Sequence, residues 1–156
     1  MYRLIYTSQA RPDFSEDDLH DILSEARRNN IRRGITGVLL FDGTTFLQVL
    51  EGPEDFVLAL ADTINRDPRS APISRLYSGQ ASERVLTSWS MAYLSLEQAD
   101  SDHLISRLAS NISEAPDRVP DLLDAITREL RNNENSENTI PAVVAAIAEH
   151  GQGVPA

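Results

Sequence analysis

Tyr6 and Gln48 are two residues whose types and positions could support hydrogen-bond or redox chemistry. Tyr6 lies among aliphatic residues of a strand-like segment, and Gln48 shares a strand face with Phe46 and Leu50. A phenol can donate an electron and a proton, and an amide that turns over exchanges its donor with its acceptor. The structural alternatives are a core tyrosine bonded to a carbonyl and an edge-strand glutamine with its amide in solvent.

Two further pairs of residues suggest a ligand. Trp89 and Met91 lie two apart on an expected strand and therefore on one face of it, where ordinary aromatic–sulfur packing explains them equally well. Asn29 and Asn30 come at the expected end of a helix. They either cap that helix or present two amides to the polar edge of a heterocycle.

A slot for a flat ring is possible between two helices. Ile22 and Ile64, one from each expected helix, are either core residues or the two sides of such a slot. Arg69 follows the break at Asp67-Pro68 and either meets a phosphate or lies solvated. The chain has no cysteine, and its three histidines lack metal-ligand spacing, so no metal site is predicted.

The elements that must position these residues alternate in type. Ser15 is the expected N-cap of a helix that ends near Asn29 and Asn30, before Gly34, and a second helix stops at Asp67-Pro68. An Asp-Gly pair at 42–43 predicts a hairpin turn. The expected strands span 4–8, 35–41, 45–51, 73–80 and 83–96. This order predicts an α+β, ferredoxin-like (βαββαββ) fold with a five-stranded mixed sheet and two helices on one face.

The chain after residue 96 has a different character. Two amphipathic helices are expected over about 97–112 and 117–132, and their apolar stripes would suit the open face of the sheet. A polar linker over 132–139 and a short apolar helix over about 141–149 follow. We therefore divide the chain into a core (1–95), C-terminal helices that cap the sheet or carry output (96–133) and a terminal segment (134–156).

Composition narrows the function classes. A length of 156 residues predicts one domain, and a net charge of −10 opposes binding to nucleic acid or to anionic membranes. No run of 18 apolar residues and no signal-peptide layout occur, so a cytoplasmic protein without a membrane anchor is expected. Phosphate-binding loops, zinc-protease motifs and serine-hydrolase motifs are absent from the sequence.

Several separated motifs in residues 2–94 resemble the BLUF family, blue-light sensors that use FAD. Their order and spacing agree with the family over this range. The matching segments are Tyr6-Thr7-Ser8, Asn29-Asn30, residues 34–41, residues 46–52, residues 64–67 and Trp89-Ser90-Met91.

The resemblance implies a role for each candidate residue. Tyr6 would donate the electron and proton in the photoreaction, and Gln48 would bridge its hydroxyl to the flavin edge. Trp89 and Met91 would lie close to Gln48 and relay its state to the last strand. The implied FAD-binding set is Ile22, Asn29, Asn30, Gln48, Ile64, Asp67 and Arg69.

The resemblance also implies how the protein signals. We expect a short photoreceptor that is not an enzyme, whose output passes through a downstream protein or a change in a homo-oligomer. The acidic C-terminal part, with its apolar helix faces, is the candidate interface. Ser70 stands where the family often has histidine, which puts only the phosphate-side assignment in doubt. The alternatives are a light-independent flavin redox sensor and an acylphosphatase-like hydrolase, although no convincing phosphate loop occurs.

Overall fold

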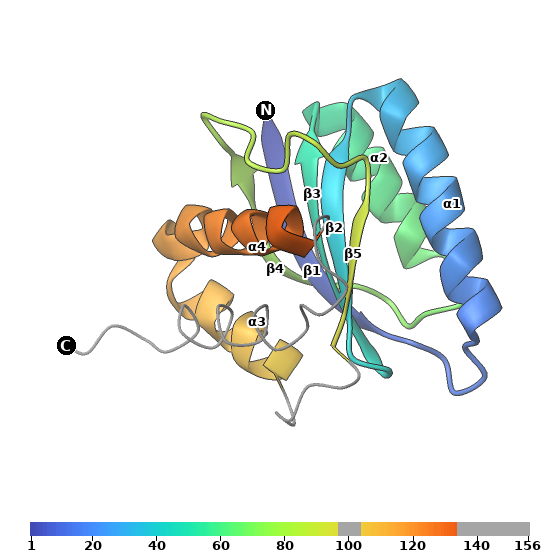
Figure 1. Cartoon of the computed structure of the whole chain (residues 1–156). Helices are drawn as coiled ribbons and strands as arrows, with labels where there is room; N and C mark the ends of the chain where they lie inside the picture. Colours follow the sequence, from blue (N-terminus) through green and yellow to red (C-terminus); the bar gives the residue numbers. More distant parts are fainter. Residues whose placement is uncertain (97–103, 134–156) are drawn as a thin grey trace.

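A five-stranded mixed sheet forms the centre of the computed structural model, which describes residues 1–96 and 104–133 (Figure 1). The strand order is β4-β1-β3-β2-β5. The strands are β1 (Tyr2–Gln9), β2 (Thr36–Phe41), β3 (Thr45–Gly52), β4 (Ser74–Gln80) and β5 (Ala92–Ser95). The helices are α1 (Glu16–Arg33), α2 (Glu54–Asn65), α3 (Leu104–Glu114) and α4 (Val119–Asn133), with a 3-10 turn, η1 (Pro116–Arg118), between the last two.

The strand directions confirm the predicted ferredoxin-like topology. β3 is antiparallel to both of its neighbours, β1 and β2, and β4 is antiparallel to β1. β5 adds a fifth strand, parallel to β2, at the edge of the sheet. β3 is therefore a central strand, and the alternative that Gln48 lies on an edge strand is wrong.

Helix α1 is longer than the sequence pattern predicts. The Ser15 side chain caps its first turn in a capping box with Asp18, as expected from an N-cap followed by acidic residues. The helix continues through Asn29 and Asn30 and ends at Gly34, whose left-handed backbone (φ 65°) suits glycine. The predicted helix end at Asn29 and Asn30 is therefore wrong, and neither residue is the C-cap.

The sheet separates two hydrophobic clusters, one on each face. Along β3, Phe46, Gln48 and Leu50 point toward the face covered by α1 and α2. Leu47 and Val49 point toward the opposite face, which α3 and α4 cover (Figure 1). The apolar stripes of the C-terminal helices thus pack where the sequence predicted. Leu104, Ile105 and Leu108 of α3 and Leu122, Leu123, Ile126 and Leu130 of α4 are all buried there.

The predicted strand over 83–96 is mostly wrong. Only Ala92–Ser95 pairs as β5, and residues 81–91 cross from β4 to β5 without regular structure. Trp89 packs against the cluster under α3 and α4, whereas Met91 belongs to the cluster under α1 and α2, so the two do not share a strand face. The terminal segment 134–156 lies outside the described residues. Within the described ranges, no helix is long and apolar enough to span a membrane.

Candidate functional site

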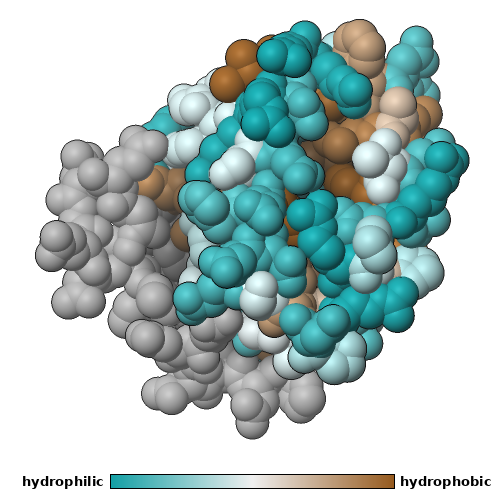
Figure 2. All heavy atoms as spheres, turned by 90° about the vertical axis from the view of Figure 1, so that its right-hand side faces the viewer, coloured by the Kyte–Doolittle hydropathy of each residue, from teal (hydrophilic) through white to brown (hydrophobic). Residues whose placement is uncertain are grey.

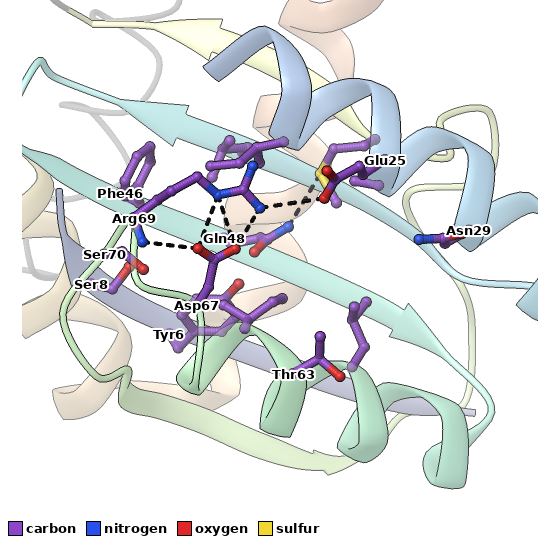
Figure 3. Close-up of a pocket in the computed structure, with 16 residues that line it drawn as sticks. Tyr6, Ser8, Glu25, Asn29, Phe46, Gln48, Thr63, Asp67, Arg69 and Ser70 are labelled. Carbon is purple, nitrogen blue, oxygen red and sulfur yellow. Dashed lines mark hydrogen bonds and ion pairs between the residues drawn. The ribbon is translucent and has the colours of Figure 1, made fainter. Parts of the chain in front are cut away.

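A cleft lies between α1, α2 and the sheet, and it brings together most of the predicted site residues. Figure 2 views the molecule from this side and shows hydrophobic surface between hydrophilic side chains. Eight predicted residues line the cleft (Figure 3), namely Tyr6, Ile22, Asn29, Gln48, Ile64, Asp67, Arg69 and Met91. One face of the sheet forms its floor, because every second residue of a strand points to the same side.

Tyr6 and Gln48 lie side by side on the cleft floor. Their Cα atoms are direct partners in the antiparallel pairing of β1 with β3. Side chains at directly opposite positions leave the same face of the sheet with Cβ atoms about 4.5–5.5 Å apart. Gln48 is 7% exposed, and its amide nitrogen donates to the sulfur of Met91 at 3.4 Å. Gln48 is thus a buried amide with a protein partner for its donor.

The Tyr6 hydroxyl is buried and has no hydrogen-bond partner among the described residues. Tyr6 is only 1% exposed, and burial raises the pKa of its phenol well above the ordinary value. The phenol therefore stays neutral at any physiological pH and keeps its proton to donate. Leaving a buried hydroxyl unpaired costs about 1–3 kcal/mol, which a ligand in the cleft could recover by accepting from it.

Ile22 of α1 and Ile64 of α2 line the cleft from its two helical sides. Ile22 lies one helical turn from Ala26, and Ile64 one turn from Leu60, which also line the cleft. Each helix therefore contributes an apolar strip, because residues four apart share a helix face. Two apolar walls over a floor with few polar groups suit a flat, mostly apolar ring.

A charged cluster lies at one end of the cleft. The Arg69 guanidinium donates to both oxygens of Asp67, with a closest separation of 2.6 Å, and reaches Glu25 at 3.3 Å (Figure 3). The hydrogen bond from Arg69 lowers the pKa of Asp67, and the same bond raises the pKa of Arg69. Arg69 is only about a quarter exposed, so it can meet an anionic group at the cleft while Asp67 holds it in place.

Two predicted site residues do not line this cleft. Asn30 is fully buried, and its amide nitrogen donates to the Ser90 carbonyl at 2.7 Å. Its amide oxygen has no partner among the described residues. Trp89 lies in residues 81–91 and packs toward α3 and α4, so the expectation that it lies beside Gln48 with Met91 is corrected.

Sequence reasoning missed half of the residues that line the cleft. They are Ser8, Glu25, Ala26, Leu39, Phe46, Leu60, Thr63 and Ser70. Periodicity contained the signal for several of them: Ser8 follows Tyr6 by two positions, and Phe46 precedes Gln48 by two. Glu25 carried no such signal, and Ser70 was noted only as a departure from the family pattern, because their places depend on how a helix and a distant loop meet.

Residues 1–92 match the family BLUF, described as sensors of blue light using FAD. The photoactivated adenylate cyclase subunit beta of Euglena gracilis is 32% identical over 149 residues, which cover 92% of this chain. The blue light- and temperature-regulated antirepressor BluF of Escherichia coli is 34% identical over 102 residues, or 65% of this chain. The chain spans 17% of the length of the cyclase subunit and 25% of that of the antirepressor.

A solved structure shares the fold as well as the sequence. The dark-state structure of BlrB, described as a BLUF protein, superposes with a TM-score of 0.68 at 30% identity. The match covers 81% of this chain and 95% of that chain. The similarity therefore extends over most of both molecules.

Proposed function

This chain belongs to the BLUF family of flavin-dependent blue-light sensors, and from that membership we propose that its cleft binds FAD and that Tyr6 and Gln48 carry its photoreaction. The observation that carries the proposal is the buried Tyr6 hydroxyl, which has no partner in the described part of the chain, beside a buried Gln48 amide at the floor of an apolar cleft. A structural tyrosine would have its hydroxyl bonded to the protein. Here the hydroxyl is left for a ligand.

The side chains present fit a flavin. Ile22 and Ile64 would hold the ring between α1 and α2, and Gln48 and Asn29 would offer amide groups to its polar edge. The Asn30 amide oxygen is a second buried polar atom without a partner among the described residues, which supports a nearby donor in the loaded protein. The Asn30 amide nitrogen already donates to the Ser90 carbonyl, so the implied contact requires the flavin to reach the amide beside that carbonyl.

We propose FAD rather than FMN as the flavin. The family is described as using FAD. Asp67 and Arg69 line the cleft, and Arg69 is suited to meet a phosphate group, which both flavins carry. Chromatography of the flavin released from purified protein distinguishes the two, because FMN lacks the adenylate. Recovery of FMN alone would overturn this assignment.

The bound flavin supplies blue-light absorption and an acceptor for an electron and a proton. Tyr6 holds the proton at its hydroxyl, and its burial keeps the phenol neutral until light drives the transfer. Gln48 offers a donor on one side of its amide and an acceptor on the other, and its donor now lies on the Met91 sulfur. Rotation or tautomerisation of this amide would exchange the two and change what Met91 receives.

We propose that this chain senses light and that a partner protein, a further domain or a second copy carries the output. The related cyclase subunit and antirepressor are named for activities regulated by light. The surface formed by α3 and α4 is the candidate for the output contact, because these helices lie on the face opposite the cleft. We therefore propose that the chain acts as a sensor and does not itself catalyse a reaction.

The decisive experiment is an absorption spectrum of purified protein before and after blue light, followed through dark recovery. We expect flavin bands that shift slightly to the red and then return. Flavin bands that ignore light would favour the light-independent redox sensor. Colourless protein that takes up no added FAD would overturn the proposed function. It would favour the alternative of a hydrolase on this fold.

A further inference from the structure

The segment between β4 and β5 joins the two faces of the sheet. Residues 81–91 leave one edge of the sheet, cross it near the start of β1, and enter β5 at the other edge (Figure 1). Leu86 of this segment is buried in the cluster under α3 and α4, and Met91 is buried in the cluster under α1 and α2. A displacement of this segment would therefore be felt in both clusters.

A buried ion pair lies under this segment. Arg3 of β1 and Glu51 of β3 are direct cross-strand partners, and their side chains are 4% and 0% exposed. The Nε and Nη2 atoms of Arg3 both donate to Oε2 of Glu51, at 3.2 and 2.9 Å. A buried carboxylate needs partners for its charge. Removing one partner of such a pair leaves an unpaired charge away from water, which is strongly destabilising.

This pair also bonds the backbone of the crossing segment. The Leu86 N–H donates to Oε1 of Glu51 at 2.7 Å, and the Val85 N–H contacts both carboxylate oxygens at 3.2 Å. Arg3 in turn donates to the Glu83 carbonyl at 3.1 Å. The ion pair thus fixes three backbone groups in a segment that has no strand or helix of its own.

The other end of the segment is bound to the cleft side. The Trp89 carbonyl accepts from the Gly37 N–H of β2 at 3.0 Å. The Met91 carbonyl accepts from Arg27 of α1 at 3.0 Å, and the Met91 sulfur accepts from Gln48. Four residues separate Leu86 from Met91, so the position of one limits the position of the other.

We infer that Glu51, held by Arg3, is a positioning residue that sets where Met91 meets Gln48. This inference rests on the proposed function for its consequence in the photocycle, but the geometry is a property of the protein without flavin. The hydrogen bonds of the Glu51 side chain go to Arg3, Val85 and Leu86, and none of these residues lines the cleft. Its side chain would act on Met91 through the backbone between Leu86 and β5.

The test compares Glu51→Gln with Leu123→Ala. The glutamine keeps the size of the side chain but leaves Arg3 without a counter-charge. Leu123 is fully buried in the cluster under α3 and α4, and its truncation lowers stability without changing the ion pair. The chain holds two methionines, and Met91→Leu therefore assigns the Met91 methyl resonance directly.

In flavin-free protein, Glu51→Gln is expected to speed amide exchange at Val85 and Leu86 at least about tenfold and to shift or split the Met91 methyl resonance. Leu123→Ala is expected to leave that resonance in place. In flavin-loaded protein, the rate of dark recovery is expected to change at least about threefold in Glu51→Gln and not in the control.

A Met91 resonance that stays at its wild-type position while exchange at Val85 and Leu86 rises would overturn the inference. If the wild-type protein binds no flavin, the proposed function fails while the methyl measurement still decides this question. Should Glu51→Gln not fold, the paired variant Arg3→Met with Glu51→Leu is the alternative. It removes both charges together, so no unpaired charge is left buried, and it also removes the hydrogen bonds to the segment. It is expected to displace the Met91 resonance in the same way, and an unchanged resonance would overturn the inference.

Discussion

Tyr6 and Gln48 are cross-strand partners whose side chains rise from one face of the sheet. Within residues 1–96 and 104–133 the Tyr6 hydroxyl has no hydrogen-bond partner, whereas the Gln48 amide donor is bound. The backbone pairing of β1 with β3 sets the separation of the two residues. A change at the Gln48 amide therefore alters the surroundings of the phenol while the strands stay in register.

Tyr6→Phe is expected to keep bound flavin and abolish the photocycle. The ring of phenylalanine fills the same space, and only the hydroxyl that would donate the electron and proton is lost. The measurement is the light-minus-dark absorption difference of the variant against the wild type. A variant that still shows a full, reversible red shift would remove Tyr6 from the mechanism.

The same substitution is expected to stabilise the flavin-free protein by about 1 kcal/mol, because it removes a buried hydroxyl that has no partner among the described residues. The measurement is urea unfolding of both proteins after the flavin is removed. Tyr77→Phe is the matched control, since its half-buried ring lies on β4, away from the cleft. A loss of stability in the Tyr6 variant would mean that its hydroxyl is bonded in the flavin-free protein.

Ile22→Trp is expected to weaken flavin binding at least about tenfold, because the larger side chain fills the slot from the α1 side. Ile31→Trp is the matched control, as Ile31 lies on the same helix and is 70% exposed. The measurement is fluorescence titration with FAD, with circular dichroism to verify folding. Equal affinity in the two variants would place the flavin elsewhere.

Asp67 is expected to make the stability of the protein depend on acid pH. Its folded pKa is lowered, first by the hydrogen bond from Arg69, so its contribution is complete above the unfolded value of about 3.9. That contribution is lost as the pH falls through the lowered folded pKa. The difference in urea midpoint between wild type and Asp67→Asn should therefore shrink below about pH 4. A difference that grows on acidification would contradict the sign.

Local pattern was sufficient for most of the fold. Ser15 and the acidic residues after it located the start of α1, and alternation placed Gln48 on one strand face with Phe46 and Leu50. The slot between Ile22 and Ile64 followed from helical spacing, once the family resemblance had joined the two helices. These features depend on residues that are close in sequence, where periodicity is informative.

The conformation of the segment before β5 could not be predicted, because it depends on residues that are distant in sequence. Its alternating residues suggest a strand, but its backbone bonds go to Glu51 and Gly37, more than 30 residues away. The sequence did not single out Arg3 and Glu51, although they form a buried pair. Such pairing is decided by which strands become neighbours, which no local pattern contains.

The alternation along β3 separates its residues into two sets that face different parts of the protein. Substitutions at Phe46, Gln48 or Leu50 act on the cleft, while those at Leu47 or Val49 act on the packing of α3 and α4. A lineage can therefore conserve one set and let the other drift toward a new neighbour. The face toward α3 and α4 can therefore change while the cleft face is kept. A sensor of this fold can in this way acquire a new output without a change in its cleft.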